Sequence, residues 1–492
     1  MKNLIFCSLF ALFSLSGMSQ SFELIVDKGY GSGDYYEEED VHIWAKTPPE
    51  NVVFTGWTGN GTEFLKDAGE WHTTLRIPEG KDVGTIALTA NFAALGSDIQ
   101  MVLSKIDLWG EYNNDPSTRF RTQKPYYRVL PTDPKGIVFM FHGTGGSAHS
   151  FFKKYETFST VKDLVYNNYG VIVLSSNETD IGDQNGDEKI RWIASPGNRD
   201  TSNNVDLKNI AELKSILISK YGFGDIPFFT YGVSNGANFS DLVSASLDFT
   251  AGVHMTGNGN ATLFKLHPSV KPTLWLQARN DQNVSADSNV AVANYQKMLE
   301  RGIYTEWYWL DKSPLYAQRF TRSLNNIEKP LSNDIFDAFS DNDLVDDDNI
   351  LNFDIIDPDE IAKVLSPLNL PKSQFKDVLN QLKVLNADHG GHGEYNRKII
   401  RFFDRFSETI TAVEKPKASY LDIRIFPNPC ANFLKIYTPY QIQSYRIFNA
   451  NGEVMKEQNL YLDIDVSNLP QGTYFIQVVT DEGTTSQKFI KS

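Results

Sequence analysis

The sequence predicts a multidomain protein with a central α/β domain, a mostly parallel sheet covered by helices on both faces, and a small β domain on either side. Three observations support this prediction. The chain has 492 residues, which is too long for one ordinary domain. Over residues 98–412, short continuous apolar runs alternate with helix-length stretches, which is typical of parallel strands buried on both faces. Residues 20–95 and 421–492 contain strand-like runs separated by turn residues.

The composition limits the partners of the protein. Hydrophobic residues make up 41% and aromatic residues 13% of the chain, which indicates a packed core rather than disorder. The formal net charge is −15. A chain this acidic repels polyanions, so we expect neither nucleic acid nor an anionic membrane surface as its partner.

Residues 1–19 have the features of a secretory signal peptide. A lysine precedes an apolar run over residues 4–15, and small residues before Gln20 fit a cleavage site. The run is too short to span a membrane, so we expect no transmembrane segment after cleavage. Cleavage also removes Cys7 and leaves one thiol, Cys430, which excludes an internal disulfide in the mature chain.

Residues 20–95 are predicted to form a small β module. The stretches GYGSGDYYEEEDVHIWA, FTGWTGNGTEF and ALTANF resemble the β-rich repeat of internalin-like surface proteins and of many secreted Bacteroidetes proteins. The resemblance implies glycan or surface binding, and a spacer or stabilising role is the alternative. Trp57 and Trp71 would stack on sugars in the first case and fill a small core in the second.

Residues 413–420 read as a linker, and residues 421–492 as a small β-sandwich with turns at Asn451-Gly452 and Gln471-Gly472. The stretches FPNP, FNANGEV, VSNLPQGTYFIQV and KFIKS resemble the C-terminal sorting domain of the type IX secretion system of Bacteroidetes. In that family the domain directs the protein across the outer membrane and is often removed. The resemblance implies the type IX machinery as a partner and a location at the surface or outside.

Within the central domain, Ser234 is the candidate nucleophile. It lies between Gly232 and Gly236 in a G-x-S-x-G pattern, after the buried strand IPFFTY and before a stretch that can be helical. In such an elbow the neighbouring glycines avoid collisions with the crossing strand and helix. A tight turn with a capping serine is the alternative interpretation.

A glycine-rich turn follows the apolar run VFMF and is the candidate oxyanion loop. The backbone amide of Thr144 or Gly145, together with that of Asn235, is expected to stabilise an oxyanion. A phosphate-binding loop is the alternative, but the pattern GxxxxGK[ST] is missing. His142 is expected to brace the loop rather than to transfer protons.

Asp281 follows the late apolar run PTLWLQAR and is the candidate acid, with a helix N-cap as its alternative role. Asn280 could occupy the same place but cannot carry the charge. Two histidines in DHGGHG are candidates for the base: His389, which follows the apolar run LKVLNAD and is favoured, and His392. A metal site at these histidines would need further ligands at suitable spacing, which the sequence lacks.

The chain order Ser234, Asp281, His389 is that of α/β-hydrolases. Residues 98–412 resemble secreted α/β-hydrolases of the esterase, feruloyl-esterase and polyhydroxyalkanoate-depolymerase type. The resemblance implies a serine esterase that works through an acyl-enzyme without a cofactor, on a polymeric or glycan-linked ester. A surface-binding protein with an idle hydrolase domain and a serine peptidase are the alternatives.

An insertion separates the last predicted sheet strand, residues 305–311, from His389. It covers about residues 312–385 and is predicted to form short helices joined by acidic turns. Because the insertion ends in the catalytic loop, we expect a helical lid or substrate wall. A remote stabilising extension is the alternative.

One acidic stretch resembles the start of a calcium loop. Asp183, Asn185 and Asp187 stand at its positions one, three and five. Glu188 replaces the glycine of position six, and the glutamate of position twelve is missing. A solvated acidic turn is the favoured alternative.

Overall fold

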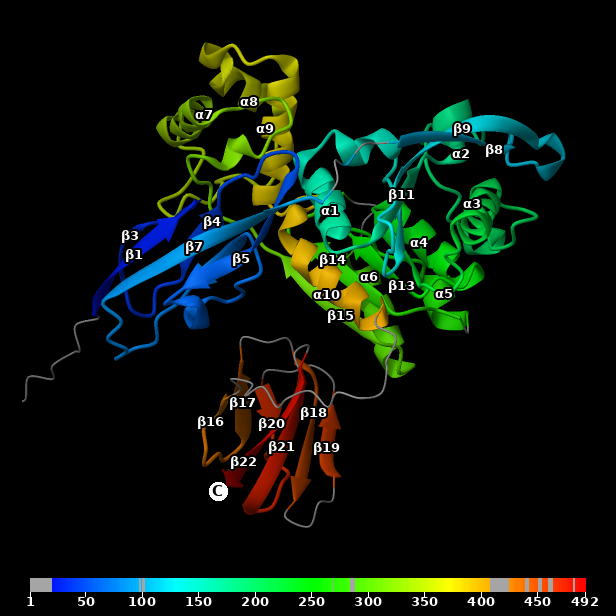
Figure 1. Cartoon of the computed structure of the whole chain (residues 1–492). Coiled ribbons are helices and arrows are strands. Elements are labelled where there is room, and N and C mark those ends of the chain that lie inside the picture. The colour runs from blue at the N-terminus through cyan, green and yellow to red at the C-terminus, as the bar shows by residue number, and fades with distance from the viewer. Residues whose placement is uncertain are drawn as a thin grey trace, which may run out of the picture. The chain divides into compact units, whose positions relative to one another are not determined.

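The computed structural model describes residues 20–96, 99, 102–267, 269–283, 288–407, 424–438, 442–449, 454–458, 463–480 and 483–492 (Figure 1). The predicted signal peptide 1–19 with Cys7, and the predicted linker 413–420, lie outside the described residues. Contacts divide the chain into two compact units. The first consists of the described residues up to Pro48 together with Phe54–Ala93, and the second consists of Pro49–Val53 and Ala94–Ser492. Among the described helices, none is long and apolar enough to cross a membrane.

The first unit is built from two small sheets, with the strand orders β3-β1-β7-β5 and β2-β4-β6. Trp57 and Trp71 are only 4% and 8% exposed. The indole nitrogen of Trp57 donates to the carbonyl oxygen of Glu70 at 2.9 Å. The two tryptophans therefore fill the core of this unit and do not offer a sugar-stacking surface. The strands are β1 (Ser21–Asp27), β2 (Gly29–Tyr30), β3 (Gly33–Tyr36), β4 (Val41–Ala45), β5 (Val52–Gly59), β6 (His72–Leu75) and β7 (Thr85–Ala94).

An eight-stranded sheet, with the order β15-β14-β13-β12-β10-β11-β9-β8, forms the centre of the second unit. All neighbours from β10 to β15 pair in parallel, whereas β9 is antiparallel to both β8 and β11. The predicted mostly parallel sheet is confirmed. The strands are β8 (Val102–Gly110), β9 (Phe120–Val129), β10 (Ile137–Phe141), β11 (Gly170–Leu174), β12 (Phe228–Val233), β13 (Ala251–Met255), β14 (Thr273–Ala278) and β15 (Thr305–Leu310).

Helices cover both faces of this sheet. In β10, Val138 and Met140 belong to the hydrophobic cluster that includes α1 and α10, whereas Phe139 and Phe141 belong to the cluster that includes α3 and α4. Alternate side chains of one strand therefore enter two cores, which is why its sequence is apolar throughout. The helices are α1 (Tyr155–Tyr166), α2 (Asn177–Ile181), α3 (Val205–Tyr221), α4 (Asn235–Ser246), α5 (Ala261–Leu266), α6 (Ser288–Glu300) and α10 (Asn396–Ser407).

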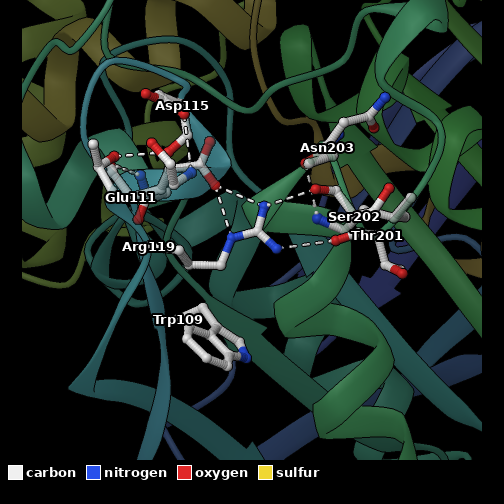
Figure 2. Close-up of polar contacts among 12 residues, drawn as sticks. Trp109, Glu111, Asp115, Arg119, Thr201, Ser202 and Asn203 are labelled. Carbon is white, nitrogen blue, oxygen red and sulfur yellow. Dashed lines mark hydrogen bonds and ion pairs between the residues drawn. The ribbon is translucent and has the colours of Figure 1, made fainter.

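Arg119, in the connection between β8 and β9, links this connection to the loop before α3. Figure 2 shows its guanidinium group between Glu111 and the loop before α3. Nη2 of Arg119 donates to Oε2 of Glu111 at 2.7 Å, and Nη1 donates to the carbonyl oxygen of Thr201 at 3.2 Å. Glu111 is 1% exposed, so the pair holds a buried charge in place.

The insertion before His389 forms a helical subdomain, as predicted. It contains α7 (Lys329–Asp341), α8 (Pro358–Val364) and α9 (Lys372–Leu385). These helices have a hydrophobic cluster of their own, which includes Phe320, Ile335, Phe339, Val378 and Leu382. The insertion is therefore a folded element rather than a long loop, and its last helix, α9, ends shortly before His389.

The C-terminal residues form two sheets, with the orders β16-β17-β20 and β19-β18-β21-β22. Their buried side chains make one cluster, as expected of a small sandwich, and Cys430 is a buried free thiol within it. The strands are β16 (Arg424–Phe426), β17 (Phe433–Tyr437), β18 (Ile442–Asn449), β19 (Val454–Gln458), β20 (Asp463–Asp465), β21 (Gly472–Thr480) and β22 (Gly483–Lys491).

Candidate active site

Ser234 lies at the sharp turn between β12 and α4. Its backbone has φ 56° and ψ −119°, a conformation that L-residues rarely adopt. The surrounding hydrogen bonds hold it there: the Ser234 amide donates to the carbonyl oxygen of Met255 at 3.0 Å, and the Ala237 amide donates to that of Ser234 at 2.9 Å. Such strain persists only where neighbouring structure over-determines it, and it is typical of functional sites.

The two glycines of the elbow are required by close backbone approaches. A Cβ atom at Gly232 would lie 2.2 Å from the carbonyl oxygen of Gly236. A Cβ atom at Gly236 would lie 2.2 Å from the carbonyl oxygen of Phe141, at the end of β10. Any side chain at either position would therefore force the strand and the helix apart.

The glycine-rich loop after β10 runs past the serine. A Cβ atom at Gly143 would lie 3.8 Å from Oγ of Ser234. The Gly145 amide donates to the carbonyl oxygen of Ile190 at 2.8 Å, so Gly145 is not available as the oxyanion donor that the sequence allowed. The amides of Thr144 and Asn235 donate to no acceptor within the described residues. These two amides remain as candidate oxyanion donors.

His142 braces this loop. Its Nδ1 donates to the carbonyl oxygen of Gly143 at 2.8 Å, and its Nε2 accepts the Ser176 amide at 3.1 Å. The imidazole is 2% exposed, and burial lowers its pKa to about 4. A neutral ring that uses both nitrogens to fix the backbone therefore braces the glycine-rich loop, as predicted.

Asp281 and His389 form a direct pair. Nδ1 of His389 lies 2.8 Å from Oδ2 of Asp281, and their side chains are 19% and 7% exposed. Oδ1 of Asp281 accepts the Asn283 amide at 2.9 Å, so the carboxylate also shapes its own turn. Asn280 does not take this place: its side-chain Nδ2 donates to the carbonyl oxygen of Asp354 at 2.9 Å. An imidazole oriented in this way presents Nε2 to a nucleophile.

The loop that carries His389 is anchored beside the serine elbow. Oγ1 of Thr256 donates to the carbonyl oxygen of Gly390 at 3.0 Å and accepts the Gly390 amide at 3.3 Å. Thr256 directly follows Met255, whose carbonyl oxygen accepts the Ser234 amide. No hydrogen bond joins Oγ of Ser234 to the ring of His389 within the described residues. In unliganded enzymes such bonds are often long and shorten when substrate binds.

His392 has a different environment. It is 2% exposed, its Nε2 donates to the carbonyl oxygen of Asp388 at 2.8 Å, and burial lowers its pKa. It therefore supports the loop from within the core, and His389 is the histidine that lies against a carboxylate.

Glu156, in the first turn of α1, is a positioning residue that the sequence did not reveal. Its carboxylate accepts bonds from Nε and Nη2 of Arg322 at 3.0 and 2.9 Å, from Nε2 of Gln381 at 3.0 Å, and from the Gly393 amide at 3.2 Å. Burial raises the pKa of Glu156, but the guanidinium groups of Arg322 and Arg319 outweigh burial and lower it overall. One buried carboxylate thus connects the insertion with the loop that follows His389.

The acidic turn at residues 183–188 is closed by its own backbone. Oδ1 of Asp183 accepts the amides of Asn185 and Gly186 at 3.0 and 2.9 Å, and Asp187 pairs with Arg191. In the part of the chain that the structure describes, no group of three or more His, Cys, Asp or Glu is arranged to hold a metal. The turn therefore offers no built calcium site.

Comparisons with known proteins identify the C-terminal segment. Residues 424–492 match the family of secretion system C-terminal sorting domains. No curated protein matches the chain. Solved structures similar to the chain include a dienelactone hydrolase from Anabaena variabilis (15% identity, 42% of this chain and 84% of that one, TM-score 0.30). An esterase from Pyrococcus furiosus is also similar (13% identity, 42% of this chain and 82% of that one, TM-score 0.29). So is an acetyl xylan esterase from Aspergillus awamori (13% identity, 39% of this chain and 80% of that one, TM-score 0.26).

Because these TM-scores are low, the assignment of a mostly parallel α/β fold rests on the strand order and the strand pairing of the central sheet. The sorting domain determines the location of the protein. The chain carries a C-terminal type IX sorting domain and is exported to the cell surface or the extracellular space.

Proposed function

We propose that this protein is a secreted serine hydrolase that cleaves carboxylic ester bonds. The observation that carries the proposal is the bond of 2.8 Å between His389 and Asp281, in a loop tied to the strained elbow of Ser234. A serine on a strained turn, a histidine oriented by a buried carboxylate, and unoccupied backbone amides form the set of groups that acyl transfer needs.

In this mechanism Oγ of Ser234 attacks the ester carbonyl carbon while Nε2 of His389 takes the hydroxyl proton. Asp281 holds the ring and stabilises the imidazolium, and the amides of Asn235 and Thr144 stabilise the oxyanion. The bond to the alcohol oxygen then breaks, and His389 gives the proton to the departing alcohol. Water attacks the acyl-enzyme by the same route, releases the acid and restores Ser234. The groups of the chain suffice for each step.

In this proposal the insertion forms one wall of the substrate site. Asn380, Gln381, Lys383 and Val384 of α9 line a cavity that His389 also lines. Export out of the cell adds a second argument, because an external hydrolase meets substrates that are too large to import. We therefore propose a polymeric or glycan-linked ester as the substrate.

The test is turnover of short-chain 4-nitrophenyl esters by the purified chain, together with labelling by a fluorophosphonate. We expect turnover, and we expect mass spectrometry to locate the label on Ser234. No turnover and no label would favour the surface-binding protein with an idle domain. Faster cleavage of peptide than of ester substrates would favour the peptidase.

A further inference from the structure

A cavity of about 110 Å³ lies beside the candidate base. Three elements line it: the start of α1, the second half of α9, and the loop from His389 to His392. Gly391 of this loop lies close to Val233, the residue before the nucleophile, since a Cβ atom there would be 4.0 Å from the Val233 side chain. The cavity has room for several water molecules or for a group the size of a carboxylate or sulfate. It is therefore placed to receive part of a substrate.

The cavity has lysine side chains in its lining, although the whole chain has a net charge of −15. Lys154 and Lys383 both line it. Lys154 forms no ion pair within the described residues, whereas Lys383 forms a long ion pair with Asp388, at 3.8 Å. Burial lowers the pKa of Lys154, and the charges of Lys383 and Lys376 lower it further. Glu156, the one carboxylate in the lining, is already paired with Arg322.

Other polar groups at the cavity have no partner within the described residues. Lys154 is the N-cap of α1 and provides no side-chain capping bond. The backbone amides of Tyr155, Glu156 and Thr157 donate to no acceptor within the described residues, and Tyr155 and Glu156 line the cavity. Two buried atoms of α9 also lack partners: Nδ2 of Asn380 and Oε1 of Gln381, whose side chain is 1% exposed. An uncapped helix start with nearby lysines attracts an anion.

We propose that this cavity binds an anionic group, a carboxylate or a sulfate, carried by the alcohol part of the ester substrate. The inference rests on the proposed function, in which His389 protonates the departing alcohol, so that a cavity beside His389 faces the alcohol. Lys154, Lys383, the first amides of α1 and Nδ2 of Asn380 donate to the anion. Oε1 of Gln381 accepts a bond from a hydroxyl next to it, as in an acidic sugar.

The experiment compares three acetate esters with the full chain: 4-acetoxybenzoate, 4-acetoxybenzenesulfonate and the neutral 4-acetoxybenzamide. The measured quantity is the ratio of kcat/KM for each anionic ester to that for the neutral ester. The variants are Lys154→Gln and the double variant Lys154→Gln/Lys383→Gln. Lys372→Gln is the matched control. Lys372 is exposed at the start of α9, the helix that also carries Lys383, and it does not line the cavity.

We expect the ratio to fall about tenfold in Lys154→Gln and further in the double variant, since a bond to a charged group is lost each time. The control should leave the ratio unchanged. A fall for the benzoate alone identifies a carboxylate site, and a fall for the sulfonate alone identifies a sulfate site.

Turnover of all three esters with ratios that no variant changes would overturn the anion site and leave the proposed function intact. Turnover of none by the unmodified chain would overturn the proposed function, and the anion site with it.

Discussion

Nδ1 of His389 lies 2.8 Å from Oδ2 of Asp281, although 108 positions separate the two residues in the chain. The aspartate follows β14, whereas the histidine follows the last helix of the insertion. Their bond makes Nδ1 the donor and leaves Nε2 for a serine proton. The first prediction tests Ser234 as the source of that proton, and the second tests His389 against His392 as the group that takes it.

Replacing Ser234 by alanine should lower kcat/KM for a 4-nitrophenyl ester by about 10³-fold or more, because loss of a triad nucleophile has effects of at least this size. The fold should persist, and the melting temperature shows whether it does. Ser246→Ala, at the other end of α4, is the control. Activity within about tenfold of the unmodified chain would exclude Ser234 as the nucleophile.

His389→Ala and His392→Ala should separate catalysis from stability. His389 is partly exposed and bonded to Asp281, so its loss should reduce kcat by several orders of magnitude with a small change in melting temperature. His392 is buried and bonded to the Asp388 carbonyl, so its loss should mainly lower the melting temperature. The opposite pattern would make His392 the base.

Glu156→Gln should weaken both the fold and the loop that carries the proposed base His389. The change leaves Arg322 buried without its counter-ion, and breaking such a pair costs about 3–5 kcal/mol. It also weakens the bond that holds the Gly393 amide, so kcat should fall as well. Denaturant unfolding and ester kinetics measure the two effects. The double variant Glu156→Gln/Arg322→Met should recover part of the stability, and a failure to do so would argue against the charge pair as the cause.

The contribution of His142 to the stability of the protein should fall as the pH drops from 6.5 towards 4, whereas Asp163, whose pKa burial raises to about 6, contributes in the opposite direction. Burial lowers the pKa of His142 from 6.5 to about 4, so the unfolded chain binds a proton in this range while the folded chain does not. The stabilisation is complete above pH 6.5 and lost near pH 4, and it amounts to about 3 kcal/mol. Melting temperatures at pH 7 and 4.5 measure it. His142→Gln should flatten the dependence, whereas His149→Gln, at an exposed position, should not.

A chain that ends at Val413 should retain its ester turnover and lose its export. The C-terminal sheets have a hydrophobic cluster of their own, and every residue of the proposed triad precedes the sorting domain at 424–492. Turnover of the purified short chain and its location in a host with type IX secretion are the two measurements. A soluble but inactive short chain would show that the C-terminal domain belongs to the catalytic unit.

The sequence alone predicted the features that depend on local patterns. The parallel strands from β10 to β15 can be predicted from the sequence because strands buried on both faces are continuously apolar. The turn at Ser234 can be predicted because neighbouring backbone atoms lie so close to Gly232 and Gly236 that only glycine fits at these two positions. The hairpin of β8 and β9 was not predicted, because β8 is largely exposed and its sequence lacks a continuous apolar run.

The tertiary structure alone decided which groups meet. The Gly145 amide is occupied because Ile190, far along the chain, brings a carbonyl oxygen to it. Glu156 accepts the amide of Gly393, 237 positions away, and no local pattern marks a glutamate for that contact. His389 and His392 stand in nearly identical glycine-rich surroundings in the sequence, yet one is paired with Asp281 and the other is buried. Each of these outcomes depends on packing between distant segments, because a hydrogen bond is decided by the position of its partner and the exclusion of water around it.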